Sequence, residues 1–131
     1  MGIIRRTKSV KTLLNAFEQK GIAISSADLV ERFYSIMNKT TVYRILQRLE
    51  DDGALHSFIG KDGLRWYALN NGNSYSHHLG THPHFQCKYC GKTECLNINT
   101  PIPELTNYNI ESVSLLMVGK CSECLALDTT D

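Results

Sequence analysis

Two Cys-x-x-Cys pairs constrain the fold of this 131-residue chain more than any other feature of its sequence. Cys87 and Cys90 form the first pair, and Cys121 and Cys124 form the second, after an interval of 30 residues. Each pair places two thiolates about one turn apart, so together they can close a tetrahedral shell around Zn²⁺, with Zn–S distances near ~2.3 Å. Because four protein ligands leave no open position, we predict a structural zinc ion that stabilises a small C-terminal domain.

The alternative for these cysteines is thiol chemistry. A dithiol redox enzyme normally carries one Cys-x-x-Cys on a βαβ frame, and the sequence shows no such frame. The N-terminus lacks the apolar core of a secretory signal, so we expect a cytoplasmic protein whose thiols stay reduced. No apolar run approaches the ~18 residues of a membrane span, so we expect no membrane association. We expect neither an enzyme nor a small-molecule substrate.

Histidines gather around the first cysteine pair. Residues 77–95 hold four of the five histidines and three of the five cysteines. If the pair closes a hairpin with its two cysteines opposed, then Thr93 faces His84 and Cys95 faces His82. Three potential ligands, His82, His84 and Cys95, would then lie on one side of the hairpin.

A fourth ligand for this second site is available from His77 or His78. Imidazoles combined with a thiolate favour Zn²⁺ over Mg²⁺, Mn²⁺ or Fe²⁺. We therefore predict a regulatory site for a second Zn²⁺ or another divalent metal. The alternatives are a solvent-exposed histidine cluster, or a buried Cys95 that acts as a small apolar side chain.

Charge is distributed unevenly along the chain, although the net charge is only +1. Residues 1–48 contain nine Lys or Arg and three Asp or Glu, whereas residues 49–131 contain five and ten. A basic half joined to an acidic half is typical of a nucleic-acid-binding protein with a separate sensing or assembly domain. The alternative is a basic helix face that is merely solvated.

Three helices are predicted in the basic half. The apolar spacing i, i+3, i+4, i+7 predicts a helix over residues 7–19 that ends at Gly21. Residues 25–28 form a capping sequence for a second helix, and a third begins after Asn38 and ends at Gly53. The positions expected to be buried are Leu29, Phe33, Ile36 and Met37 in the second helix, and Val42, Ile45, Leu46 and Leu49 in the third.

A β-hairpin is predicted after the third helix, because residues 60–63 read Gly-x-x-Gly between β-prone runs at 55–59 and 64–69. Three helices and a hairpin make a winged helix; the alternative is a small helical domain with a surface hairpin. The polar face of the third helix suits base edges and phosphates in a major groove, and it consists of Tyr43, Arg44, Gln47 and Arg48.

The remaining chain reads as a joint followed by short strands. Residues 70–76, NNGNSYS, are polar and rich in turn residues. Strands are expected near residues 84–86, 93–98 and 112–118. We therefore predict an α+β protein with a winged helix-turn-helix DNA-binding domain at 1–69, a hinge at 70–81 and a metal-binding domain at 82–131.

Motifs over nearly the whole chain occur together in one known family. In the N-terminal half they are Arg6-Thr7-(x)3-Lys11 and residues 41–53, TVYRILQRLEDDG. In the C-terminal half they are residues 82–92, HPHFQCKYCGK, and residues 119–124, GKCSEC. On these motifs the chain resembles the ferric uptake regulator family of metal-dependent transcriptional repressors.

The resemblance implies that the C-terminal domain is a small α/β dimerisation domain, and that a homodimer binds palindromic operators in double-stranded DNA. It implies that the four-cysteine site is structural and that His82 and His84 belong to a regulatory site at the hinge. The residues expected to contact DNA are Tyr43, Arg44, Thr41, Gln47, Arg48 and Lys39 on the recognition helix, and Lys8, Lys11 and Arg6 in or next to the first helix.

The chain also departs from the family pattern. Relatives often carry a histidine before the second helix, where this chain has Ala23 or Ile24, and a carboxylate at the end of the wing, where it has Ala68. Cys95 falls where the family often places a carboxylate ligand. The dimer-domain helix of relatives is expected to shrink to a short turn near residues 101–106. Sulfur in place of a carboxylate makes the chain similar to the zinc uptake regulator branch.

The sequence thus predicts a zinc-responsive DNA-binding repressor that controls metal homeostasis genes. Two alternatives stay open. One is an iron- or peroxide-responsive regulator of the same family. The other is a zinc-stabilised interaction module without regulated DNA binding, which would show no salt-dependent affinity for duplex DNA.

Overall fold

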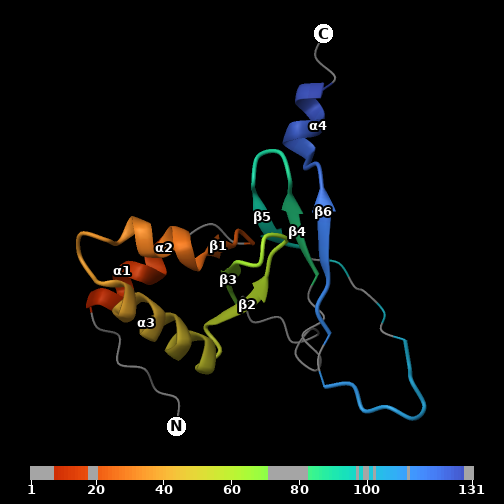
Figure 1. Cartoon of the computed structure of the whole chain (residues 1–131), viewed down its shortest axis with the longest axis horizontal. Coiled ribbons are helices and arrows are strands. Elements are labelled where there is room, and N and C mark those ends of the chain that lie inside the picture. Colours follow the sequence, from red (N-terminus) through yellow and green to blue (C-terminus); the bar gives the residue numbers. More distant parts are fainter. Residues whose placement is uncertain are drawn as a thin grey trace. The chain divides into compact units, whose positions relative to one another are not determined.

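The computed structural model describes residues 8–17, 21–70, 83–96, 98, 101, 103–111 and 113–128 (Figure 1). The chain divides into two compact units, residues 1–71 and 72–131. Across the described residues, every helix is too short or too polar to cross a membrane.

Unit 1 is a winged helix, as predicted. Its three strands form one antiparallel sheet in the order β1-β3-β2, and β2 and β3 are the two strands of the wing. In chain order the elements are α1 (Lys8–Leu14), the 3-10 turn η1 (Asn15–Phe17), β1 (Ile24–Ser25), α2 (Ser26–Arg32), α3 (Lys39–Asp51), β2 (Leu55–Ile59) and β3 (Arg65–Leu69).

One apolar core holds these elements together. It includes Val10 and Leu13 of α1, Leu29 of α2 and the β-strand residues Leu55 and Tyr67. Each fully buried aliphatic side chain contributes roughly 1.5–3 kcal/mol relative to exposure. The four positions predicted to be buried in α3 are all in this core, namely Val42, Ile45, Leu46 and Leu49.

The helix ends follow the predicted local signals. Ser25 Oγ accepts a hydrogen bond from the Asp28 N–H at 3.1 Å, and Asn38 Oδ1 accepts from the Thr41 N–H at 2.8 Å. These side chains satisfy N–H groups that the first turn of a helix leaves unpaired. At the other end of α3, Gly53 has φ of +85°, which a residue without Cβ adopts at little cost.

Two predictions in unit 1 need correction, and one element was missed. Helix α2 ends at Arg32, and a turn follows in which the Met37 N–H donates to the Phe33 carbonyl. Because the helical period stops there, Ile36 is not buried as predicted but is 61% exposed. The first helix is α-helical only to Leu14 and then tightens into η1. Strand β1 was not predicted, because two residues carry no periodic signal of their own.

Unit 2 contains a three-stranded sheet and one short helix. Strand β4 lies in the centre, antiparallel to β5 and parallel to β6. Helix α4 was not predicted, β5 stops before the expected residue 98, and β6 starts after the expected residue 112. The elements are β4 (His84–Cys87), β5 (Thr93–Cys95), β6 (Leu116–Gly119) and α4 (Ser122–Asp128).

The segment between β5 and β6 forms no helix among its described residues, and a turn lies at residues 106–107. This agrees with the expected loss of the dimer-domain helix. Apart from Asn70, the predicted hinge at 70–81 lies outside the described residues.

Candidate metal centres and nucleic-acid interface

The sulfur atoms of the two Cys-x-x-Cys pairs meet in unit 2, all within 4.8 Å of one another. Cys87 ends β4, Cys90 lies in the following turn, Cys121 precedes α4 and Cys124 lies in its first turn. The Sγ atoms of Cys87 and Cys124 are 3.7 Å apart, as are those of Cys90 and Cys121. A tetrahedral zinc–thiolate shell with Zn–S near ~2.3 Å has sulfur–sulfur edges of about 3.8 Å. The cluster therefore has the dimensions of a zinc site.

Backbone N–H groups favour the thiolate form of one of these cysteines, Cys87. Burial alone would raise the pKa of the Cys87 thiol, but the N–H groups of Cys90, Cys121 and Tyr89 point at its sulfur and lower the pKa to about 6. Their nitrogens lie 3.4 to 3.5 Å from Cys87 Sγ. Burial and the neighbouring thiols raise the pKa of Cys124 to about 12. Sulfurs this close ionise together only around a cation, so the donor set fits Zn²⁺.

The turn between β4 and β5 corrects the predicted hairpin register. The Cys87 N–H donates to the Lys92 carbonyl at 2.9 Å, and the Gly91 N–H donates to the Cys87 carbonyl at 3.1 Å. Cys90 therefore lies inside the turn and does not face Cys87, contrary to the prediction. Gly91 closes this turn with φ of +83°. The physical reason for the error is that the turn extends from Cys87 to Lys92 and so shifts every following pair by two residues.

The second candidate site is built on the resulting pair. Cys95 lies directly opposite His84, not opposite His82, and Thr93 lies opposite Gln86, not opposite His84. Opposed residues of an antiparallel pair project to the same side. The ligand atoms of His84 and Cys95 accordingly lie within 4.8 Å of each other.

The electrostatics of this pair favour the neutral thiol. His84 is buried and Cys95 is half-buried. Burial, together with the nearby Glu94 carboxylate, raises the pKa of Cys95 to about 12. A divalent cation is therefore needed to hold Cys95 as a thiolate at neutral pH. The other residues predicted for this site, His77, His78 and His82, lie outside the described residues.

The predicted recognition surface of unit 1 is open to solvent. Tyr43, Arg44, Gln47 and Arg48 are exposed along α3, on the side opposite its buried positions. The other predicted DNA contacts of α3 are in its first turn, where Lys39 is exposed with its Nζ 5.8 Å from the Tyr43 ring centroid and Thr41 is half-buried. Lys8 and Lys11 are exposed on α1, and Arg6 lies outside the described residues.

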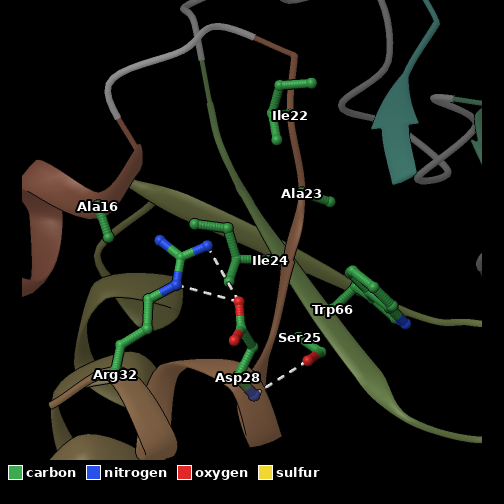
Figure 2. A pocket seen from close by; sticks show the side chains of 8 residues that line it. All are labelled: Ala16, Ile22, Ala23, Ile24, Ser25, Asp28, Arg32 and Trp66. Carbon is green, nitrogen blue, oxygen red and sulfur yellow. Dashed lines mark hydrogen bonds and ion pairs between the residues drawn. The ribbon is translucent and has the colours of Figure 1, made fainter. Parts of the chain in front are cut away.

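A cavity of about 280 Å³ lies in unit 1, on α2, β1 and Trp66 (Figure 2). Ala23 and Ile24, which occupy the place where the family resemblance predicts a histidine, line it. Its charged side chains are Asp28 and Arg32, which form an ion pair at 3.0 Å. The cavity therefore offers no imidazole or thiol ligand for a metal.

The sequence comparisons agree with the motifs. A family described as the ferric uptake regulator family matches residues 4–117. Ferric uptake regulation proteins of Neisseria meningitidis and Neisseria gonorrhoeae are 33% identical over 92 residues. This match covers 66% of the chain but only 59% of each relative, so the chain spans less than two thirds of the length of these relatives.

Solved structures share the fold. A zinc uptake regulator complexed with zinc and DNA has 20% identity and a TM-score of 0.63, covering 97% of this chain and 87% of that one. The Vibrio cholerae ferric uptake regulator has 21% identity and a TM-score of 0.58, covering 90% and 92%. At these identities the similarity concerns the fold alone.

Proposed function

The chain belongs to the ferric uptake regulator family, and on this basis we propose that it is a metal-responsive DNA-binding transcription regulator whose regulatory metal is zinc. We propose further that it is a cytoplasmic homodimer that represses metal homeostasis genes. The observation that carries the choice of metal is the pairing of Cys95 with His84 across β4 and β5.

The geometry of α3 supports DNA binding. Asn38 fixes the start of the helix after the short turn that follows α2, and the wing follows its end, as in winged helix-turn-helix proteins. Its exposed side chains combine cations, an amide and a phenol, which are the groups that contact base edges and phosphates. The similar structure of a zinc uptake regulator bound to zinc and DNA is consistent with this proposal.

The donor atoms support zinc as the regulatory metal. Hard cations such as Mg²⁺ and Mn²⁺ prefer oxygen ligands, whereas a thiolate beside an imidazole favours Zn²⁺. We propose that His84 and Cys95 are joined by His82 and by His77 or His78 in this site. The four-cysteine cluster supplies a separate structural site, in which Zn²⁺ adds binding free energy to folding.

Regulation requires that metal binding favours one arrangement of the dimer. In our proposal, occupancy of the second site favours the state in which two recognition helices match successive major grooves. A metal can shift that equilibrium only through its differential affinity for the two states, so occupancy must track operator affinity.

The test begins with an operator selected from a pool of random duplexes by the zinc-loaded protein. For the unaltered protein, filling the second site with Zn²⁺ should raise operator affinity by about 5- to 150-fold, the usual range of allosteric coupling. The double variant Cys95→Ala, His84→Ala should lose this response while it keeps one zinc ion in the four-cysteine cluster. An unchanged response in that variant would refute the assignment of the site.

An iron-responsive regulator is the second candidate, and the identity with ferric uptake regulation proteins favours it. The variant Cys95→Asp separates the two candidates, because it replaces the thiolate with the carboxylate that harder cations prefer. If the protein senses zinc, this variant should respond less to Zn²⁺ and more to Fe²⁺ or Mn²⁺. If the unaltered protein already responds best to Fe²⁺, the zinc proposal is wrong. A protein with no salt-dependent duplex affinity would instead be an interaction module.

A further inference from the structure

Two consecutive hydrogen bonds link both strands of the wing in unit 1 to the recognition helix α3. Ser57 Oγ on β2 donates to Glu50 Oε2 in the last turn of α3, at 2.6 Å. Arg65 Nη1, at the start of β3, donates to the same Ser57 Oγ, at 2.9 Å. A hydroxyl can donate one bond and accept another, so the chain Arg65–Ser57–Glu50 is chemically complete. It fixes the two wing strands to α3 through side chains.

This chain of bonds ends beside the proposed DNA-contacting face of α3. Tyr43, Gln47 and Glu50 are spaced i, i+4, i+7, so Glu50 continues the stripe that Tyr43 and Gln47 begin. The register of β2 and β3 places Ser57 and Arg65 on the same side of the hairpin. The Arg65 guanidinium is therefore held at the edge of that stripe, two hydrogen bonds away from it.

The charges of this arrangement suit a phosphate. Arg65 is exposed and carries a permanent positive charge. A guanidinium has five N–H donors, and the bond to Ser57 uses one of them, which leaves donors for a bidentate phosphate contact. The Glu50 carboxylate would by itself repel DNA, but it accepts from Ser57 and has the Arg65 cation beyond that hydroxyl.

We propose that Arg65 is a contact of the wing to the DNA backbone, and that Ser57 and Glu50 are positioning residues that hold its guanidinium against a phosphate beside the major groove. This inference rests on the proposed DNA-binding function. It assigns Arg65 to sequence-independent anchoring, in contrast to the base reading proposed for Arg44.

The first measurement is the salt dependence of binding for Arg65→Met, on the selected operator and on a random duplex. Removing one phosphate contact should make the negative slope of log K against log salt shallower by about 0.9 for each protomer bound. The loss of affinity should be equal on both duplexes, because a phosphate contact carries no sequence information. Arg65→Lys should restore the slope.

The matched control is Arg32→Met, which removes the same charge from an arginine of the same unit. The Arg32 guanidinium turns toward Asp28 beside strand β1, where the two form an ion pair (Figure 2). Its removal should leave the salt slope unchanged.

The positioning role is tested by a double-mutant cycle. Ser57→Ala changes no charge. It should weaken binding about two- to fivefold, because it removes the hydrogen bond that orders the Arg65 side chain. If Ser57 acts through Arg65, this loss should vanish in the Arg65→Met background, whereas a purely structural effect would persist there.

The outcomes are distinct from those of the proposed function. If the unaltered protein shows no salt-dependent affinity for duplex DNA, the proposed function itself fails. If the unaltered protein binds but Arg65→Met keeps the full slope, or the Ser57→Ala loss is additive, the inference about the wing is wrong and the proposed function stands.

Discussion

Loss of one cysteine from the four-cysteine cluster should unfold unit 2 while unit 1 stays folded. We choose Cys121→Ser, because Cys121 is buried and comes from the segment that closes the cluster from the far end of the chain. The matched control is Cys95→Ser, which makes the same chemical change in the same unit but outside the cluster.

The size of the effect follows from what unit 2 buries. Its described residues that are buried are few: Pro83, His84, Gln86, Cys87, Thr93 and Cys121. Proline is the one aliphatic side chain in that set, and two members are cysteines of the four-cysteine cluster. Ordering a residue costs roughly 1–2 kcal/mol of backbone entropy, which so small an apolar core does not offset. We therefore expect the folding of unit 2 to depend on the ~10–16 kcal/mol that a structural zinc ion typically supplies.

One thiolate of four accounts for about 2.5–4 kcal/mol of that free energy, if the ligands share it evenly. Cys121→Ser should therefore weaken zinc binding by about 60- to 900-fold. The zinc content after dialysis against a chelator measures the affinity, and amide hydrogen exchange resolves the two units. Exchange should accelerate in β4 and β6 but not in α3. Retention of full zinc content by the Cys121→Ser protein, with protected β4 amides, would refute the reasoning.

Three further predictions concern protons, a helix cap and a turn. The Lys92 N–H lowers the pKa of Cys90, but burial and the neighbouring thiols outweigh it and raise this pKa, as they do that of Cys124. Both thiols must lose a proton to bind zinc, so the apparent zinc affinity should fall at least ~100-fold per pH unit below neutrality. A competition titration with a flat pH profile would contradict this. Asn38→Ala removes the cap of α3 and should cost about 1 kcal/mol in urea unfolding of unit 1, whereas Asn38→Ser should cost little. Gly53→Ala should cost about 1 kcal/mol from the positive φ alone, since nothing lies within 4 Å of an added Cβ, and Gly53→Asn should cost less.

Unit 1 could be predicted from its sequence because its signals are local. The burial of Val42, Leu46 and Leu49 follows from the helical period, and the capping role of Asn38 follows from its side chain. Strand β1 escaped prediction because its two residues are extended by pairing with Tyr67 and Trp66 of β3, which lie about 40 residues away along the chain. Ile36 was misassigned because a turn at Phe33 ends the helical period one turn earlier than the apolar pattern suggests.

The cysteine cluster could be predicted in composition but not in its supporting geometry. Spacing alone paired Cys87 with Cys90 and Cys121 with Cys124, and the sulfurs of all four do meet. Two of the three N–H groups that lower the pKa of Cys87 come from a turn whose length the spacing does not specify, and the third is that of Cys121, 34 residues further along the chain. Helix α4 was missed because it is one short helix without a buried side, so it leaves no periodic apolar pattern.

The difference between the predicted and the observed β4–β5 register shows which changes in turn length the second site tolerates. Side chains alternate between the two sides of a strand, so a shift of one residue would have turned Cys95 away from the histidines. The actual shift is two residues, which preserves the side and changes only the partner: His84 replaces His82 opposite Cys95. The thiol therefore stays on the same side of the hairpin as an imidazole whenever the turn length changes by an even number of residues. It follows that inserting one residue between Cys90 and Thr93 should abolish the response to metal at the second site, whereas inserting two should weaken it without removing the thiol from that side.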